Sequence, residues 1–156
     1  MKISSSQNNP AGMIDISHKE VTKRTALASA RITLSNTAFQ KLIKDGSPKG
    51  NVFETARVAG IMAAKSTPQI IPLCHPLKLS KVHLHFEIER KKCSIKTTAE
   101  VVCLGQTGVE MEALTAVAAA SLTIYDMMKW ADQSMVISDV KLLKKTGGQS
   151  GDFKRK

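Results

Sequence analysis

Residues 81–104 read KVHLHFEIERKKCSIKTTAEVVCL, and this stretch decides the fold. Apolar and polar side chains alternate from Val82 to Glu89, as they do in a strand with one buried face. The segment KKCS at 91–94 then turns the chain into a second strand, CSIKTTAEVVCL. The two strands are therefore expected to form an antiparallel β-hairpin.

One strand and two helices are predicted before this hairpin. The β-branched end of TALASARITL (25–34) favours a strand. The Ser-Asn pair at 35–36 can cap a first helix that ends near Gly46. A second helix over 51–67 begins with Asn-Val-Phe-Glu, which resembles a capping box.

After the hairpin, the sequence predicts a long helix over about 108–131 and a final strand over about 135–143. The resulting order is β-α-α-β-β-α-β. If the first two helices form one crossover connection, this is the ferredoxin-like split β-α-β order. The predicted fold class is therefore α+β, an antiparallel sheet with helices packed on one face.

The bulk composition indicates one soluble globular domain. The chain has 156 residues, enough to bury a core without disulfides or metals. Loose segments are expected at about 1–12, which is polar, and as a mobile Gly-rich basic tail at about 145–156. No apolar run approaches the ~20 residues that a membrane helix needs. Three cysteines without CxxC spacing and no signal-peptide pattern predict a cytoplasmic protein.

The net charge of +10 favours an anionic partner. Aromatic residues make up only 4% of the chain, which leaves little surface for base stacking. The basic residues are also dispersed. The charge therefore favours a small phosphorylated ligand, although a solubilising surface with a basic tail has the same composition.

A histidine is held between two prolines in IPLCHP, residues 71–76. Each proline fixes its own φ and pushes the preceding residue towards extended geometry. The loop is therefore stiff and presents His75, whose charge can change near neutral pH. A functional histidine and a buried structural turn would both give this pattern.

The long helix is apolar on nearly every side in TAVAAASLTIYD (115–126), which predicts burial by the sheet and by another subunit. Its last turns carry Asp126 and Lys129, one turn apart on one face. A carboxylate is unfavourable at a helix C-terminus, so a working site is one explanation for Asp126. Partial burial would raise its proton affinity and suit acid/base work, with Lys129 holding the carboxylate ionised when needed. A simple i,i+3 ion pair is the alternative.

Other anion-binding features are weaker. Thr107-Gly108 leaves backbone N–H groups free before the long helix, Lys144-Lys145 precedes TGGQSG, and Lys49-Gly50 precedes the second helix. Two metal sites can be set aside. His83-x-His85 is the polar side of a strand, and Cys74, Cys93 and Cys103 lack paired ligand spacing. We expect no metal and no cofactor.

Four segments together resemble the MoaC family, the cyclic pyranopterin monophosphate synthases of molybdenum cofactor synthesis. They are MIDISHKEVTKRTA, KGNVFETARVAGIMAAKSTPQIIPLCHPL, TGVEMEALTAVAAASLTIYDMMK and KKTGGQSG, which span most of the chain from Met13 to Gly151. The departures are Ala28-Ser29-Ala30 and the polar N-terminal tail, and neither touches the motifs.

The resemblance implies a ferredoxin-like fold and a homohexamer built as a trimer of dimers, with active sites between subunits. It implies a lyase that converts 3′,8-cyclo-7,8-dihydroguanosine 5′-triphosphate to cyclic pyranopterin monophosphate and diphosphate. The carried-over catalytic residues are Asp126, Lys129, Lys49 and Lys145, the last as a mobile cation. The carried-over substrate-binding residues are Leu73, Cys74, His75, Met111 and Glu112.

Two rival classes predict different properties. A basic RRM-like nucleic-acid-binding module has the same element order, but its strands carry exposed aromatic residues, whereas Phe86 falls on the inward face. A purely structural oligomerising subunit predicts no turnover and leaves the proline-bracketed His75 unexplained.

Overall fold

The computed structural model describes residues 12–148 and 151–156, so the predicted N-terminal tail at about 1–12 lies almost wholly outside the described residues. The helices and strands are β1 (Thr22–Thr33), α1 (Asn36–Lys44), α2 (Val52–Lys65), α3 (Thr67–Ile70), β2 (Leu79–Glu89), the 3-10 helix η1 (Arg90–Lys92), β3 (Ser94–Gly105), α4 (Glu110–Met128), β4 (Val136–Thr146) and β5 (Phe153–Lys154).

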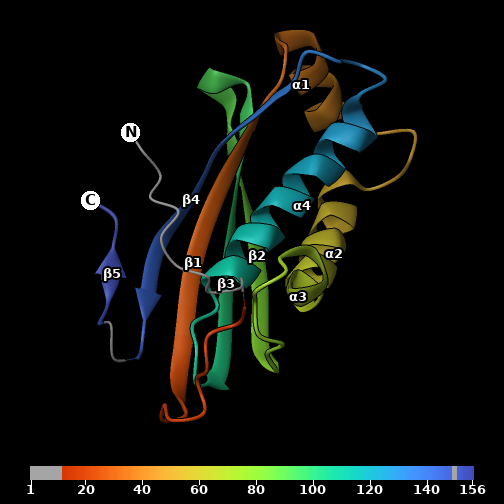
Figure 1. Cartoon of the computed structure of the whole chain (residues 1–156). Helices are drawn as coiled ribbons and strands as arrows, with labels where there is room; N and C mark the ends of the chain where they lie inside the picture. The colour runs from red at the N-terminus through yellow and green to blue at the C-terminus, as the bar shows by residue number, and fades with distance from the viewer. Residues whose placement is uncertain (1–11, 149–150) are drawn as a thin grey trace, which may run out of the picture.

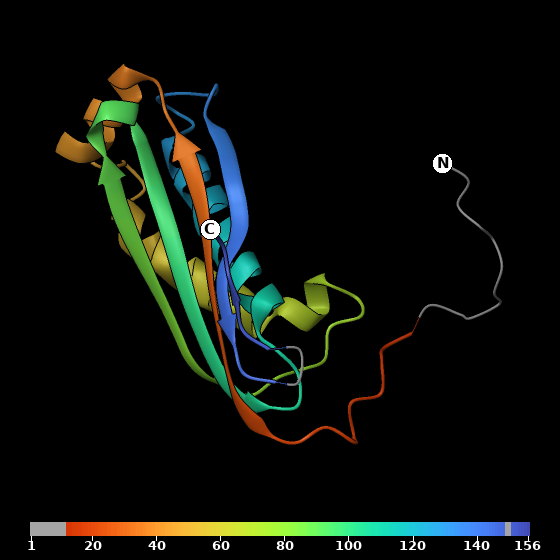
Figure 2. The same ribbon diagram turned by 90° about the vertical axis from the view of Figure 1, so that its left-hand side faces the viewer.

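The strand order confirms the predicted ferredoxin-like α+β fold. The sheet runs β2-β3-β1-β4-β5, and each neighbouring pair is antiparallel. Strand β3 lies between β2 and β1, as the split β-α-β arrangement requires. The helices cover one face of the sheet (Figure 1), and Figure 2 looks onto the opposite face.

The hairpin forms where the alternation predicts it. Leu84 pairs with Ala99 at its centre, and both side chains are buried. At the turn, η1 ends in Cys93, which has a φ of 46°. This left-handed residue lets the chain reverse directly into β3.

The core lies between the sheet and the helical layer. Helix α4 packs on β1 and β3, and α2 packs against α4 and the edge strand β2. The seam between the two helices consists of small buried residues, namely Ala56, Gly60, Ala64, Ala113, Ala116 and Ala120. Small side chains allow the two helix backbones to approach closely, and this fixes the position of α4.

Gly60 is a crowded point of this seam, and its substitution gives a stability prediction. An added Cβ would lie 2.4 Å from Leu84 Cδ2 and 2.9 Å from the Ala116 carbonyl oxygen. In an open helix Gly→Ala would be favourable by about 1 kcal/mol. Here we expect Gly60→Ala to lower the free energy of unfolding in urea by about 1–3 kcal/mol.

The exposed residue Lys65 on the same helix provides the control, because Lys65→Gln should change the free energy of unfolding by less than about 0.5 kcal/mol. A Gly60→Ala variant as stable as the wild type would show that the helix seam has room to adjust.

The structure differs from the sequence prediction mainly at element ends. Helix α4 is shorter than 108–131, because Val109 is its N-cap and Lys129 its C-cap. Strand β4 continues to Thr146, so Lys144 and Lys145 lie in a strand that also pairs with β5. Neither α3 nor β5 was predicted, since four and two residues are too short to show a period.

Candidate active site

A carboxylate between two lysines lies at the C-terminal end of α4. Asp126 Oδ2 accepts from Lys49 Nζ at 2.7 Å, and Asp126 Oδ1 lies 2.8 Å from Lys129 Nζ. Lys49 Nζ also donates to the Asp126 backbone oxygen at 3.3 Å. The three side chains therefore form one cluster from two segments that are distant in sequence.

The loop before α2 holds Lys49 in this position. Ser47 Oγ donates to the Met127 carbonyl at 2.7 Å, which fixes the loop to the end of α4. Gly50 closes the turn with a φ of 111°, a conformation that favours glycine. The Lys49-Gly50 pair in the sequence thus serves a turn that presents the lysine.

The pKa of Asp126 is lowered, whereas partial burial was expected to raise it. Its side chain is 52% exposed. Hydrogen bonds from Lys129 and then Lys49 lower the pKa of Asp126 to about 2. The predicted rise in proton affinity is therefore wrong. At neutral pH Asp126 is an anion that holds both ammonium groups, and hydrogen bonding to it raises the pKa of Lys129. The ammonium groups of the two lysines are the hydrogen-bond donors of this cluster, and Asp126 is the acceptor.

A second group of predicted residues lines a cavity of about 340 Å³ at the other end of α4. Its walls include the substrate-binding residues expected from the resemblance, which are Leu73, Cys74, His75, Met111 and Glu112. His75 Nε2 lies 2.9 Å from the Ile14 carbonyl oxygen, which can only accept, so this nitrogen is the donor. The proline loop thus brings a restrained imidazole to a cavity.

Glu112 is the carboxyl whose environment favours a proton. It is 3% exposed, and burial raises the pKa of its carboxyl. Burial likewise raises the pKa of the neighbouring Cys74 thiol. An acid in the first turn of a helix is favoured by the helix dipole, so the presence of Glu112 there does not by itself indicate a function. Its position in the helical repeat is the more informative signal, because positions 112, 113 and 116 share the buried side of α4.

Lys145 lies near this second group and away from Asp126 in sequence and structure. It pairs with Ala26 in the sheet, and its Nζ lies 3.0 Å from Glu110 Oε1. A second cavity, of about 170 Å³, is lined by Lys145 together with Lys19, Arg24, Gln106, Thr107, Gly108, Glu110 and Gly147.

Arg24 is a residue of this cavity that the sequence analysis did not single out. It is 7% exposed and lies on the buried side of β1 together with Ala26 and Ala28. An arginine in register with a buried apolar face is the signal that identifies it.

The two groups of residues lie far apart within one chain. Asp126 and Glu112 are separated by 14 residues of the continuous helix α4, which corresponds to about 21 Å along its axis. Figure 1 shows α4 as one continuous helix across the molecule, with the loop after α3 at its start and α1 near its end. A single chain therefore does not bring Asp126 next to His75 or Lys145.

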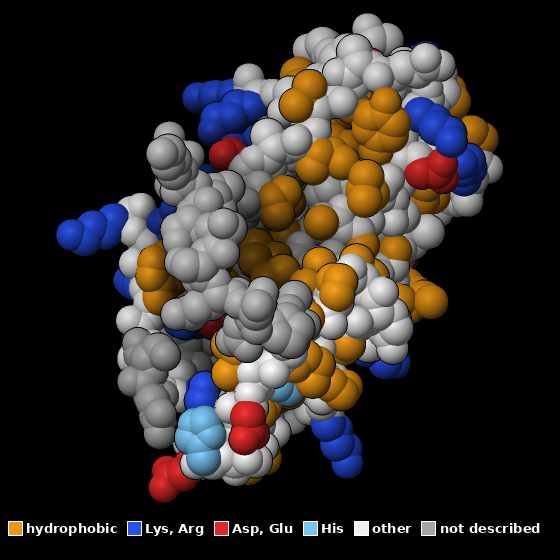
Figure 3. Space-filling model, viewed as in Figure 1, with side chains coloured by type: hydrophobic (Ala, Val, Ile, Leu, Met, Phe, Trp, Pro, Cys, Tyr) orange, Lys and Arg blue, Asp and Glu red, His pale blue; other side chains and the backbone are white. Residues whose placement is uncertain are grey.

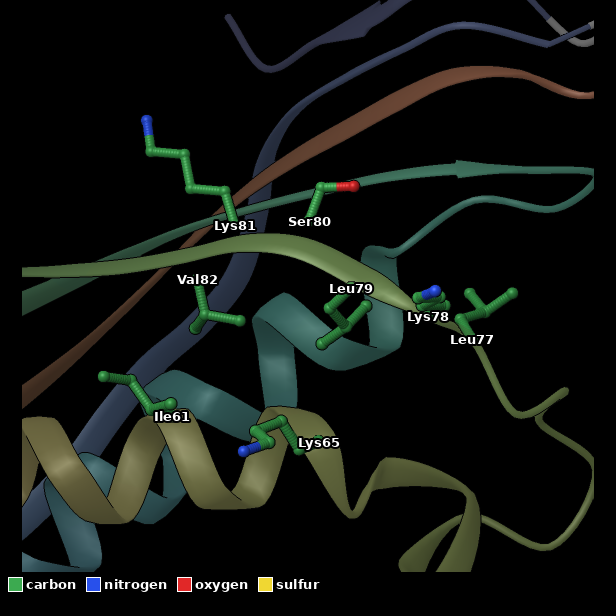
Figure 4. Close-up of a pocket in the computed structure, with 8 residues that line it drawn as sticks. All are labelled: Ile61, Lys65, Leu77, Lys78, Leu79, Ser80, Lys81 and Val82. Carbon is green, nitrogen blue, oxygen red and sulfur yellow. The ribbon is translucent and has the colours of Figure 1, made fainter.

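A further cavity, of about 480 Å³, lies between α2 and the edge strand β2. Ile61, Leu79 and Val82 face this space, whereas Ser80 and Lys81 point to the opposite side of β2 (Figure 4). Leu77 lines both this cavity and the one with His75. The side chains that line this cavity towards α2 are mainly apolar, so they can pack against a ligand but supply few groups that could take part in a reaction.

Within residues 12–148 and 151–156, no three His, Cys, Asp or Glu side chains gather as a metal site would need. In the same described part of the chain, no helix is both long and apolar enough to cross a membrane. The groups that could act on a ligand are therefore lysines, an arginine, a histidine, the carboxyl of Asp126 with its lowered pKa, and the carboxyl of Glu112 with its raised pKa. The fold and these side chains define the class, a ferredoxin-like α+β protein whose candidate sites carry clusters of cationic side chains.

Comparison with known proteins makes this class specific. The model of the MoaC family matches residues 13–148. A cyclic pyranopterin monophosphate synthase of Parvibaculum lavamentivorans is 49% identical over 96% of this chain and 94% of its own length. Synthases of the same name from Staphylococcus aureus and Staphylococcus carnosus are 48% and 50% identical, over 96% and 93% of this chain and 93% and 91% of their own lengths. The chain belongs to the MoaC family.

A solved complex of the ferredoxin protease FusC with Arabidopsis ferredoxin matches 67% of this chain and 10% of that chain. Its TM-score is 0.32 and its sequence identity 14%, which is too distant a likeness to bear on fold or function.

Proposed function

We propose that this protein is a cyclic pyranopterin monophosphate synthase, a phosphorus-oxygen lyase of molybdenum cofactor synthesis. Its substrate would be 3′,8-cyclo-7,8-dihydroguanosine 5′-triphosphate, and its products cyclic pyranopterin monophosphate and diphosphate. The curated relatives of this name support the proposal. The observation that carries it is the Lys49–Asp126–Lys129 cluster in a chain of this family.

The cluster suits the proton transfers of the proposed reaction. Opening the imidazole part of the purine and closing the pterin ring both move protons, which needs a donor and an acceptor near the ring. Lys49 and Lys129 would donate or take up protons in turn. Asp126, ionised at neutral pH, would orient both ammonium groups and stabilise their charged forms.

The cyclic phosphate step needs fixed positive charge. A hydroxyl oxygen would attack the α-phosphorus and form a new P–O bond, while the bond to the β-phosphate breaks and diphosphate leaves with the electron pair. The hydroxyl proton passes to a base. Negative charge grows on the leaving diphosphate, and preorganised lysine and arginine side chains stabilise it. We propose no cofactor for these steps.

We propose that the site is completed between subunits of a homohexamer, a trimer of dimers. About 21 Å separates the two groups along α4, so a substrate that touches both would need them from different chains. Helix α4 also leaves apolar side chains uncovered at Met111 and Leu122, and α2, which packs against α4, leaves Val58 and Met62 uncovered. Figure 3 shows apolar side chains along the path that α4 follows in Figure 1.

The nucleic-acid-binding alternative has less support. Phe86 packs against Phe53 of α2 with the rings tilted by 49° and their centroids 5.4 Å apart, so its ring is taken up on the helix side of the sheet. The opposite face of β2 presents His83, His85 and Glu87, which do not form a stacking platform. We propose a cytoplasmic single-domain enzyme that binds a small molecule, with no nucleic acid or membrane partner.

Incubation of the purified protein with the cyclised GTP derivative tests the function directly. We expect release of diphosphate together with a pterin product, measured by chromatography and mass spectrometry. Filter binding to RNA at moderate salt tests the alternative. RNA retention without diphosphate release would favour the nucleic-acid-binding module.

A further inference from the structure

Helix α1 is attached at both of its ends to the C-terminal end of α4, beside which it lies in Figure 1. At its start, the backbone N–H of Ser35, which is the N-cap of α1, donates to Asp132 Oδ2 at 2.7 Å. Beyond its end, Ser47 Oγ donates to the Met127 carbonyl at 2.7 Å. Since Asp132 follows the last residue of α4 by four positions, the two contacts lie on either side of the helix end that carries Asp126.

The hydroxyl of Ser47 makes two contacts that together place Lys49. It donates to the Met127 carbonyl and accepts from the Lys49 backbone N–H at 3.2 Å. The last carbonyl groups of a helix have no partner within the helix. In α4 the loop supplies partners for two of them, because Ser47 Oγ binds the Met127 carbonyl and Lys49 Nζ binds the Asp126 carbonyl at 3.3 Å. The same loop brings Lys49 Nζ to 2.7 Å from Asp126 Oδ2.

Asp132 is held by three hydrogen bonds. Its Oδ2 accepts from the Ser35 N–H, and its Oδ1 accepts from the N–H and the hydroxyl of Ser134 at 2.8 and 2.6 Å. The bonds from Ser134 and then from Ser35 lower the pKa of Asp132 to about 2. The carboxylate is therefore charged at neutral pH, and hydrogen bonds to a charged acceptor are stronger than neutral ones. The segment that follows Lys129 is thus fixed to the start of α1.

A third contact joins α1 to this segment between the two ends. Lys41 Nζ lies 5.2 Å from the centre of the Trp130 ring, a distance at which an ammonium group is attracted to an aromatic face. The buried side chains of α1, which are Ala38, Phe39 and Leu42, hold one face of the helix on the core. Apolar packing is non-directional, so the polar contacts fix where α1 lies along that surface.

The arrangement connects the two lysines of the cluster. Lys49 follows the last residue of α1 by five positions, and Lys129 is the C-cap of α4. Their side chains are 49% and 54% exposed, so little packing restrains them. A long exposed side chain loses rotamer entropy when it is held in one place. The backbone of each lysine must therefore be well placed for its ammonium group to stay bonded to Asp126.

We propose that Ser47 and Asp132 are positioning residues, which hold Lys49 and Lys129 at Asp126 by attaching both ends of α1 to the end of α4. Ser47 acts through the backbone of Lys49, and Asp132 acts through the turn that follows Lys129. The effect on turnover rests on the proposed function. The effect on the two lysines can be measured without any substrate.

Lysine labelling tests the attachment directly. The whole protein is treated with an amine-acetylating reagent at fixed pH, and the rate at each lysine is read from peptides by mass spectrometry. In the wild type we expect Lys49 to react more slowly than Lys44, an exposed lysine of α1, because Asp126 holds its ammonium group. Ser47→Ala should speed the labelling of Lys49 by about two- to tenfold, as the loss of one hydrogen bond implies, and should leave Lys44 unchanged.

Turnover of the cyclised GTP derivative gives the second measurement. Ser47→Ala should lower kcat by about two- to tenfold and change KM little, because a group that acts in the reaction is displaced while the charges that bind substrate remain. Ser47→Thr keeps the hydroxyl and should restore most of kcat. Ser66→Ala is the matched control and should behave as the wild type. Ser66 is an exposed serine at the end of α2, and its hydroxyl forms no hydrogen bond among the described residues.

Asp132→Ala removes the other attachment and covers the case in which Ser47→Ala fails to fold. It should speed the labelling of Lys129, whereas Asp132→Asn keeps an oxygen that can accept from Ser35 and should retain part of the wild-type protection.

Three outcomes separate the inference from the proposed function. Unchanged labelling of Lys49 and Lys129 in the alanine variants would overturn the inference, whether or not the wild type releases diphosphate. Faster labelling with an unchanged kcat would overturn the positioning role in the reaction. Faster labelling in a protein whose wild type shows no turnover would support the attachment and remove the proposed function.

Discussion

Asp126→Asn should reduce turnover of the cyclised GTP derivative by about 10²–10⁴-fold, the usual contribution of proton transfer by positioned groups. The carboxylate is the shared hydrogen-bond acceptor of Lys49 and Lys129, at 2.7 and 2.8 Å. An amide has no charge to hold either ammonium group in place. Diphosphate release, measured by a coupled phosphate assay, gives the rate. Because Asp126 is half exposed, we expect thermal unfolding and substrate binding to change little.

The pH dependence of the residual activity provides a second measurement. Hydrogen bonding to Asp126 raises the pKa of Lys129. In the Asn variant this support is lost, so the Lys129 pKa should fall, and any step that needs the protonated lysine should fail at lower pH than in the wild type. The alkaline limb of the rate profile would then shift towards neutral pH.

Asp45→Asn is the matched control for this prediction. Asp45 is an exposed carboxylate at the end of α1, close in sequence to Lys49, and it forms none of the side-chain bonds found among the described residues. Its substitution should leave the rate unchanged. Near-native turnover by Asp126→Asn would show that the reaction does not need the carboxylate to orient Lys49 and Lys129, whatever the control shows.

The strands and long helices could be predicted from the sequence because one periodic signal determines each of them. Strict alternation from Val82 to Glu89 sets both the strand and its buried face, and Leu84 is buried as that alternation requires. The Asn51 cap also forms as predicted, with its side chain accepting from the Glu54 N–H at 3.1 Å. Each of these signals lies within a few neighbouring residues, so the sequence alone is enough to detect it.

The properties of the site depend on contacts that no local pattern contains. Partial burial was expected to raise the proton affinity of Asp126. Hydrogen bonds from Lys129, three positions further along α4, and from Lys49, on a loop 77 positions earlier, instead lower its pKa to about 2. Glu112 is the reverse case, since tertiary burial gives a first-turn acid a raised pKa. Charge and burial at a site are set by neighbours that are distant in sequence, so residue type and spacing identify the members of the site but not their protonation.

The position of Lys145 shows the same limit. The Gly-rich sequence after it predicts mobility, yet Lys145 itself lies in β4 with an ion pair to Glu110. Lys144 and Lys145 also pair with Lys154 and Phe153 of β5. The glycines at 147 and 148 are used for close approach to Arg24. The glycines at 147 and 148 are therefore required because a side chain would collide with β1, which the sequence pattern alone does not distinguish from flexibility.

The largest expected effect concerns the two ends of α4. We predict that two inactive variants, Asp126→Asn and His75→Ala, recover activity when they are mixed under conditions that allow subunits to exchange. If each site takes Asp126 from one chain and His75 from its partner, every mixed dimer has one site with both changes and one with neither. Random mixing at equal amounts makes half of the dimers mixed, so about a quarter of the wild-type activity should return.

A second mixture separates this result from nonspecific rescue. Lys49 lies in the same cluster as Asp126 on the same chain, so Asp126→Asn mixed with Lys49→Ala leaves a defect in every site, and no activity should return. Recovery in the first mixture and none in the second places the two ends of α4 in one site across a subunit boundary. The opposite outcome is no recovery in either mixture, despite subunit exchange observed by mass spectrometry. It would mean that each site takes both the cluster around Asp126 and the cavity around His75 from the same chain. The 14-residue spacing along α4 would then have to be bridged by a change in the chain's own conformation.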